Sequence, residues 1–330
     1  MPHVETVTGP VDPARLGRVL PHEHLQMLVP GPWLSGGQGD HRADIAVAAL
    51  ERMRSFGFDT VVDLTPYEVG VRDLDTLREI SERSGVHVVA GSSIYLEPYS
   101  PAWALEADLA EMHRRFVQDA TAGTGEAGVK VGIFGEQATS LNEITPHEEK
   151  CLRAAARAAA DTGLALNTHT THGTMALEQL AILREERADL SRVVIGHMDI
   201  QPDPAYVRRV LDSGASVGFD TLGKQFWDFV VAPLPERMPE GDFPKRAYFR
   251  SDAARIKEIA DLVADGFAPQ ILMSMDMTGH EVYLNPRTHG QSGYSFLGDV
   301  VIPELTALGV SGADLEQMLV TNPRNLLTIN

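Results

Sequence analysis

The segment RVLPHEHL, residues 18–25, places His22 and His24 two positions apart after a short apolar run. If this segment is a β-strand, side chains at positions i and i+2 point to the same face, so the two imidazoles converge on one point. Neutral imidazole is a common ligand of Zn²⁺ and related divalent ions. The two histidines are therefore either ligands of one metal ion or close together by chance. The other residues of the chain decide between these interpretations.

Other polar residues lie at or near the ends of further short apolar runs. They are His169, His197 and Asp276, together with Asp63, Tyr95 and Asp220, while Lys130 lies within the apolar run GVKVGIF. One such residue alone is commonly a turn residue or a satisfied polar group. Four histidines and an aspartate exceed the needs of one tetrahedral site. Together they predict two divalent ions that share a bridging group.

Lys130 is the unusual member of this set because a buried ammonium is poorly solvated. One interpretation is that its side chain points outward and runs between helices towards water. The other is that desolvation removes its proton and the free amine reacts with CO₂, which gives a carbamate able to bridge two cations. The surrounding histidines favour the carbamate, so we expect Lys130 to be the bridging ligand.

The elements that would position these residues alternate regularly. Eight short apolar runs are separated by amphipathic stretches, which is typical of parallel βαβ units. The runs cover residues 17–24, 58–65, 86–93, 128–134, 164–170, 192–199, 215–220 and 270–276. We predict an α/β fold in which residues 1–330 form a single (β/α)8 TIM barrel, whose strand C-termini meet at one face. The rival doubly wound sheet requires a glycine-rich phosphate turn directly after the first strand, where the chain has none.

Composition narrows the class of protein. The 330 residues carry a net charge of −18, with 43% hydrophobic and 22% charged residues. Without clustered Lys and Arg, nucleic acid is not an expected partner, and an acidic surface repels anionic membranes. The single cysteine, Cys151, excludes a disulfide framework and is expected in a helical core. With no signal-like start and no apolar run near 20 residues, we expect a cytoplasmic enzyme of small molecules.

The order of the motifs adds a family resemblance. VETVTGPVDPARLGRVLPHEHL, GVKVG, NTHT, VVIGHMD, LMSMD and TNPRNLL follow one another along almost the whole chain. In this order they resemble the phosphotriesterase family of the amidohydrolase superfamily, which includes the phosphotriesterase-like lactonases. The resemblance implies an amidohydrolase-type (β/α)8 barrel with a binuclear centre.

The resemblance also implies a role for each metal ligand. His22, His24 and Asp276 would hold the more buried ion, His169 and His197 the more exposed one, and carboxylated Lys130 would bridge them. Some relatives have a bridging glutamate one position later, where this chain has Val131. The N6-carboxylysine version is therefore expected, with two zinc ions first and manganese, cobalt or iron as alternatives.

Such a centre predicts hydrolysis by a metal-bridging hydroxide. Asp276 would accept the proton and deliver it to the leaving group, and Asp276, Lys130 and Tyr95 are the expected catalytic residues. The expected substrate is a lactone or other carboxylic ester, with slow phosphotriesterase activity as a side reaction. An amide hydrolase acting on N-acyl amino acids is the alternative enzyme. A non-catalytic barrel that binds a ligand is the alternative from another class.

Substrate recognition is predicted from departures from the lactonase pattern. Tyr95 matches the tyrosine that lactonases have after the third strand, whereas Glu97 stands where many have a second tyrosine. Thr221 replaces an arginine, and Met275 replaces a histidine. Glu97 either faces the pocket, where it would disfavour an apolar acyl tail, or turns to solvent.

The later loops contain further candidates for substrate binding. Lys245 and Arg246, in FPKRAYFR, could bind a carboxylate or phosphate, or could belong to a solvated loop. His280, four residues after Asp276, could line the pocket. A homodimer is kept as an alternative to a monomer.

Overall fold

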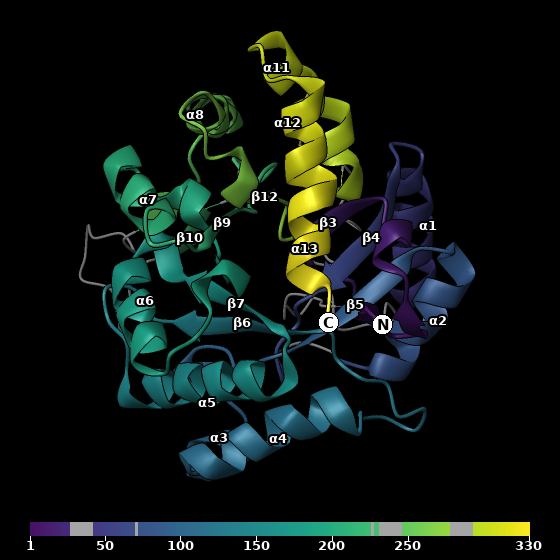
Figure 1. The fold of residues 1–330 in the computed structure, drawn as a ribbon, viewed down its shortest axis with the longest axis vertical. Coiled ribbons are helices and arrows are strands. Elements are labelled where there is room, and N and C mark those ends of the chain that lie inside the picture. The colour runs from purple at the N-terminus through teal and green to yellow at the C-terminus, as the bar shows by residue number, and fades with distance from the viewer. Residues whose placement is uncertain (27–41, 70–71, 226–227, 231–245, 278–292) are drawn as a thin grey trace, which may run out of the picture.

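The protein is described from a computed structural model, which covers residues 1–26, 42–69, 72–225, 228–230, 246–277 and 293–330. Eight parallel strands form one sheet in the order β12-β9-β8-β7-β6-β5-β4-β3, which curls into a nearly closed barrel (Figure 1). The strands are β3 (Arg18–Glu23), β4 (Phe58–Asp63), β5 (His87–Ser92), β6 (Ile133–Thr139), β7 (Ala165–Thr170), β8 (Val193–Ile195), β9 (Ser216–Phe219) and β12 (Ile271–Met273). The predicted (β/α)8 architecture is confirmed.

Helices follow the strands and cover the outside of the barrel (Figure 1). They are α1 (Arg42–Arg54), α2 (Leu74–Ser84), α3 (Ala102–Glu106), α4 (Leu109–Thr121), α5 (Pro146–Thr162), α6 (Ala176–Glu185), α7 (Pro204–Leu211), α8 (Asp252–Ala264), α11 (Ile302–Ala307), α12 (Gly312–Glu316) and α13 (Asn322–Leu327). Helix α5 shows the local signals most fully. Thr145 and Glu148 form a capping box at its start, and Gly163 ends it with φ +72°.

The hydrophobic core has two parts because alternate residues of a strand point to opposite faces. The larger cluster lies between the strands and the surrounding helices and includes Val61 and Val88. A smaller cluster contains Val62, Val89 and Val194 from neighbouring strands, so it fills the barrel interior. Because apolar side chains fill both faces of the sheet, the polar residues of the site lie at the C-terminal ends of the strands.

The barrel closes at a seam between β3 and β12. Within the described residues no strand ladder pairs these two elements. Instead, the Asp276 N–H donates to the His22 carbonyl at 3.1 Å, and the His24 N–H donates to the Met277 carbonyl at 3.0 Å. The seam therefore lies within the stretch that carries three of the predicted metal ligands.

The two ends of the described chain meet at the barrel. A hairpin of β1 (Val4–Thr6) and β2 (Gly9–Val11) begins the chain. His3 and Ile329 exchange backbone hydrogen bonds of 3.0 and 2.8 Å, and Figure 1 shows the N and C labels side by side. A second antiparallel pair consists of β10 (Asp228–Val230) and β11 (Arg246–Tyr248).

The fourth barrel strand differs from the prediction. We expected it over residues 128–134, but β6 begins at Ile133 and ends at Thr139. Thr124 and Val129 pair with each other across a turn, and the Val131 N–H donates to the Asp119 carbonyl. The backbone groups of Val129 and Val131 therefore bond outside the barrel sheet, and the strand begins only at Ile133. The strand is therefore shifted five residues along the chain, and a different acidic or basic side chain reaches its end.

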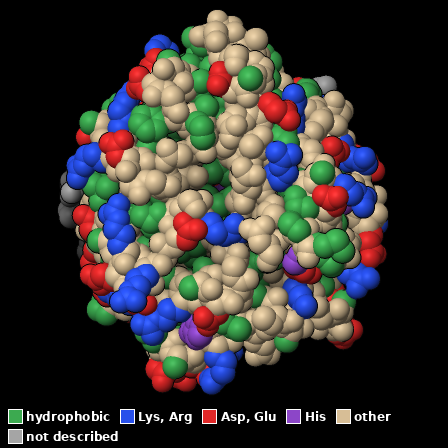
Figure 2. Space-filling view, viewed as in Figure 1, with side chains coloured by type: hydrophobic (Ala, Val, Ile, Leu, Met, Phe, Trp, Pro, Cys, Tyr) green, Lys and Arg blue, Asp and Glu red, His purple; other side chains and the backbone are tan. Residues whose placement is uncertain are grey.

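In the described part of the chain, no helix combines the length and apolarity that crossing a membrane requires. Figure 2 shows basic and acidic side chains interspersed over one face of the molecule. The visible face thus has no large patch of one sign.

Candidate metal centre

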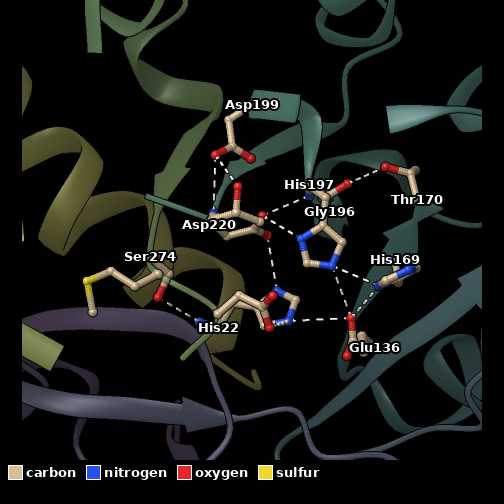
Figure 3. A network of polar contacts seen from close by, with 12 residues as sticks. His22, Glu136, His169, Thr170, Gly196, His197, Asp199, Asp220 and Ser274 are labelled. Carbon is tan, nitrogen blue, oxygen red and sulfur yellow. Dashed lines mark hydrogen bonds and ion pairs between the residues drawn. The ribbon is translucent and has the colours of Figure 1, made fainter. Parts of the chain in front are cut away.

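Six polar side chains converge at the C-terminal ends of the barrel strands (Figure 3 shows four of them). They are His22 from β3, His24 just after it, Glu136 from β6, His169 from β7, His197 two residues after β8, and Asp276 three residues after β12. The five histidine and aspartate positions are those predicted from the sequence. The glutamate was not predicted.

Glu136 lies at the centre of this group. Its Oε2 is 3.0 Å from His169 Nδ1, 3.3 Å from His197 Nε2 and 3.5 Å from His22 Nε2. Its Oε1 is 3.5 Å from His24 Nε2. One carboxylate therefore contacts imidazoles from three sides of the barrel, which is the position that a bridging ligand needs.

Asp276 lies at the seam between β3 and β12 and contacts His22 and His24. Its Oδ1 is 2.9 Å from His24 Nε2 and 3.6 Å from His22 Nε2, and its Oδ2 is 2.7 Å from Lys224 Nζ. Asp276 and His197 both adopt left-handed backbone conformations, with φ of +51° and +58°. Non-glycine residues rarely hold this conformation unless the surroundings impose it, and such positions cluster at functional sites.

Asp220 orients two of the histidines from behind. Its Oδ2 lies 3.0 Å from His22 Nδ1, and its Oδ1 lies 2.9 Å from His197 Nδ1 and accepts the His197 backbone N–H at 2.8 Å (Figure 3). A carboxylate that accepts from Nδ1 fixes the tautomer and directs Nε2 at the metal. The aspartate is buried, so both imidazoles are held rigidly.

The residues present fit a pair of divalent ions. Two sets of donor atoms lie close enough to share an ion: His22, His24 and Asp276, and His22, Glu136 and His197. His22 Nε2 is buried and has no hydrogen-bond partner, although Nδ1 of the same ring is bonded. Imidazole and carboxylate are the donors that Zn²⁺, Mn²⁺ and Co²⁺ accept. Asp220 occupies Nδ1 of His22, so this ring has one nitrogen for a metal and can serve only one set. His169, whose Nδ1 lies 2.8 Å from His197 Nε2, could take its place in the other.

The pKa shifts of the buried histidines and of Glu136 also indicate a site for cations. Burial by itself would lower the pKa of His22, but Asp220 and Glu136 raise it to about 10. Burial likewise opposes the charged form of His197, whereas Asp220 and Glu136 bring its pKa well above the ordinary value. Burial would raise the pKa of Glu136, yet His169, His197 and His22 hold it well below the usual range. The carboxylates thus attract positive charge to the ligand atoms, where metal ions displace protons.

Lys130 does not take part in this group. It lies three residues before β6, is only partly buried, and interacts electrostatically with Glu5 of the N-terminal hairpin. Lys130 therefore lies near the N-terminal end of β6, whereas the histidines lie at the C-terminal ends of their strands. The expectation of a carboxylated Lys130 bridge rested on the wrong strand boundary, and it is Glu136 that lies among the histidines. Val131, where a glutamate was sought, is a buried core residue.

The other predicted site residues have different surroundings. The Tyr95 ring meets the His169 ring edge-to-face at 5.0 Å, so Tyr95 borders the metal centre. Burial, with Glu136 nearby, raises the pKa of its hydroxyl well above the ordinary value. Glu97 is partly exposed at the start of a short 3₁₀ turn two residues further on.

Thr221 is bound within the protein. Its hydroxyl donates to Asp199 at 2.7 Å and accepts from the Arg255 guanidinium at 2.6 Å, and the side chain is buried. A role in contacting substrate is therefore not supported by this geometry. Arg246 begins β11, and its side chain, like Lys245 and His280, lies outside the described part of the chain.

Three site residues were missed or left unassigned by sequence reasoning. Glu136 has a signal in IFGEQAT, where an acid interrupts a run of apolar and small residues. Asp220 was placed at a strand end but had no role. Lys224, four residues after Asp220, is buried although it is a lysine, and only its contact with Asp276 in space reveals it.

Comparison with known proteins identifies similar chains. Residues 2–327 match the model of the phosphotriesterase family. The chain is 31% identical to the phosphotriesterase homology protein of Escherichia coli strain K12, over 93% of this chain and 96% of that protein. It is also 30% identical to an N-acetyltaurine hydrolase of Dictyostelium discoideum, over 87% of this chain and 73% of that protein.

Solved structures show the same architecture. A variant of a phosphotriesterase-like lactonase from Deinococcus radiodurans superimposes with a TM-score of 0.84 at 29% identity, covering 98% of this chain and 99% of that one. The E. coli phosphotriesterase homology protein, solved with phosphate in its active site, has a TM-score of 0.80 at 30% identity, covering 96% and 100%. These relatives support a hydrolytic enzyme rather than a non-catalytic barrel.

Proposed function

Because the chain belongs to the phosphotriesterase family, we propose that it is a binuclear metal-dependent hydrolase in which Glu136 bridges the two ions. The first candidate substrate is a lactone or other carboxylic ester, with phosphotriester hydrolysis as a side reaction. The observation that carries the proposal is the single Glu136 carboxylate within 3.5 Å of nitrogens from four histidines.

The short distances between the donor atoms support the proposed ligand sets. His22, His24 and Asp276 would hold one ion, and His169 and His197 the other. Two divalent ions bound here would acidify a water molecule and polarise a substrate carbonyl. The identity of the metal is part of the proposal, with zinc first.

Asp276 is proposed to move the proton. Burial would raise its pKa, but Lys224 and His24 keep it well below the usual range, so the carboxylate is ionised at neutral pH. Its side chain is 19% exposed, against 5% for Glu136, so Asp276 is the more accessible of the two carboxylate ligands. An ionised carboxylate that is partly exposed can take a proton from water and return it to a leaving group.

A second candidate is hydrolysis of an amide whose amine portion carries an acid, such as an N-acyl amino acid. The observation that favours it is Lys224, a buried cation next to Asp276 at the same strand ends. Lys224 is paired with Asp276 at 2.7 Å, and an ammonium has three donors, so the same side chain can also bind an acidic group of the substrate beside the reacting bond. The naming of several relatives as N-acetyltaurine hydrolases supports an acidic amide in this family.

The test is a substrate panel with protein loaded with zinc or manganese. It should contain neutral lactones, lactones with a carboxylate, N-acyl amino acids, N-acetyltaurine and a phosphotriester. We expect turnover of at least one ester or amide class, reduced by about 10²–10⁴-fold in Asp276→Asn. Turnover of none of these, or full activity of Asp276→Asn on a good substrate, would contradict the proposal.

The role of Lys224 separates the substrate classes. Lys224→Met should raise KM for acidic substrates by about tenfold or more, as loss of a charge-assisted contact implies, and should leave KM for neutral lactones nearly unchanged. Lys150→Met is the matched control, because its Nζ donates to the Ala107 carbonyl at 2.7 Å among the outer helices. Equal effects of Lys224→Met on both substrate classes would remove the acidic-substrate candidate.

A further inference from the structure

Glu23 lies between the two histidines of the HEH motif and is fully buried. Neighbouring residues of a strand point to opposite faces, so its carboxylate does not join the imidazoles. It reaches the end of β12 instead. Oε1 accepts from the Ser274 hydroxyl at 2.7 Å and the Met275 N–H at 3.0 Å, and Oε2 accepts from the Met277 N–H at 2.7 Å.

These three donors surround Asp276 in the sequence. The Asp276 N–H itself donates to the His22 carbonyl at 3.1 Å. The Ser274 hydroxyl that donates to Glu23 also accepts the His22 N–H at 3.1 Å, and Figure 3 shows this contact. The carboxylate of Glu23 thus holds the main chain on both sides of an aspartate that has a left-handed backbone, φ +51°.

The location makes these bonds important for the ligand set. The seam between β3 and β12 has no strand ladder within the described residues, so the bonds of Glu23 hold it together with the two backbone bonds of Asp276 and His24. His22 and His24 lie on one side of the seam and Asp276 lies on the other. A displacement at the seam would directly change the 2.9 Å separation of His24 Nε2 and Asp276 Oδ1.

We propose that Glu23 is a positioning residue that sets Asp276 against His22 and His24 and thereby determines the affinity and coordination geometry of one of the two ions. It does not touch the substrate. The inference rests on the proposed binuclear function and adds to it the residue that maintains one half of the centre.

The test variant is Glu23→Gln, with Co²⁺ as the probe. Glutamine keeps the shape, but its amide group has a single oxygen. Its nitrogen must face either Met277 N–H or the Ser274 and Met275 donors, so at least one buried donor loses its acceptor. We expect the wild-type protein to bind two Co²⁺ ions. In the variant one ion should bind as in wild type and the other about 10–100-fold more weakly, the effect typical of outer-shell partners.

Two further measurements distinguish positioning from general loss of stability. The visible absorption spectrum of the Co²⁺-loaded variant should change, because the geometry around the affected ion changes. With saturating Co²⁺, kcat should fall about tenfold or more while KM changes little, which is the pattern for a group that affects the reacting centre rather than binding.

Asp119→Asn is the matched control. Asp119 is another buried carboxylate, on α4, and it accepts from the Ser92 hydroxyl at 2.5 Å and from the Tyr67 hydroxyl. Its change to an amide should lower thermal stability, while Co²⁺ stoichiometry and the spectrum stay as in wild type.

If Glu23→Gln does not fold, Ser274→Ala carries the test. It removes the hydroxyl between His22 and Glu23 but keeps the bonds to Met275 and Met277, so weaker binding of one Co²⁺ and an altered spectrum are again expected. Wild-type affinities and spectrum in the folded variants would overturn the role of Glu23 alone. Fewer than two Co²⁺ ions in the wild-type protein would overturn the binuclear function and this inference with it.

Discussion

At the scale of single residues, the site depends on which anion stands between the histidines. A carbamate on Lys130 and the carboxylate of Glu136 would supply the same charge and two oxygens to a pair of cations. Only Glu136 lies within reach of His169, His197 and both histidines of the HEH motif. In the proposed centre the chemistry expected from the sequence is retained with a different residue, and we expect the centre to assemble without bicarbonate.

This difference can be tested by a pair of substitutions. Glu136→Gln should bind fewer than two Zn²⁺ ions per chain and lose at least about 100-fold in kcat, because the bridging charge that supports the centre is gone. Lys130→Ala should keep both ions and near wild-type activity. Elemental analysis and a rate assay are sufficient. Loss of metal in Lys130→Ala, restored by added acetate or propionate, would return the bridge to the lysine.

At the scale of elements, the loop after β9 connects the metal centre to helix α8. Arg255 of α8 has no exposed surface and donates to Asp199 at 2.9 Å and to Asp252 at 2.5 Å. It also donates to the Thr221 carbonyl at 2.5 Å, one residue after Asp220. The helix therefore supports the loop whose aspartate orients His22.

Arg255→Met should accordingly destabilise the protein by about 3–5 kcal/mol, since removing one partner of a buried ion pair leaves its carboxylates uncompensated. Lys257→Met on the same helix is the control. Its exposed pair with Asp261 contributes about 0–1 kcal/mol, so little change is expected. Chemical denaturation of both variants measures the difference. Equal stabilities would show that the Arg255 network does not support the fold.

At the scale of the whole molecule, the barrel brings together ligands that are far apart in the sequence, as His24 and Asp276 show with a separation of 252 positions. The cluster combines several charged groups in a buried pocket, which is unfavourable unless their charges are mutually compensated. Bound cations would provide that compensation. Fold stability and metal content are therefore expected to be coupled.

Removing the metal tests this coupling. A ligand that binds only the folded state stabilises it by RT ln(1 + [L]/Kd), which is about 2.7 kcal/mol at 100 times Kd. Treatment with a chelator should therefore lower the melting temperature by several degrees, and Zn²⁺ should restore it. Calorimetry with and without chelator gives the result. An unchanged melting temperature in protein shown to contain metal would contradict the coupling.

The sequence by itself determined the barrel and most of the residues of the proposed ligand set. Strand alternation predicted eight βα units because apolar runs and amphipathic stretches are local properties of the chain. His22 and His24 share a face because a strand has a period of two, and His169, His197 and Asp276 lie at or just after the ends of their own strands. The capping box of Thr145 and Glu148 at the start of α5 is likewise a local feature of the chain.

Only the tertiary structure decided which carboxylate lies among the histidines and what surrounds it. The boundary of β6 depends on backbone bonds to Asp119 and Ala90, which belong to other elements, so local apolarity misplaced it by five residues. The contact of Lys224 with Asp276 spans 52 positions. The bonds of Glu23 to the end of β12 exist because the barrel closes there. Such contacts arise from distant segments that pack together, and no spacing along the chain encodes them.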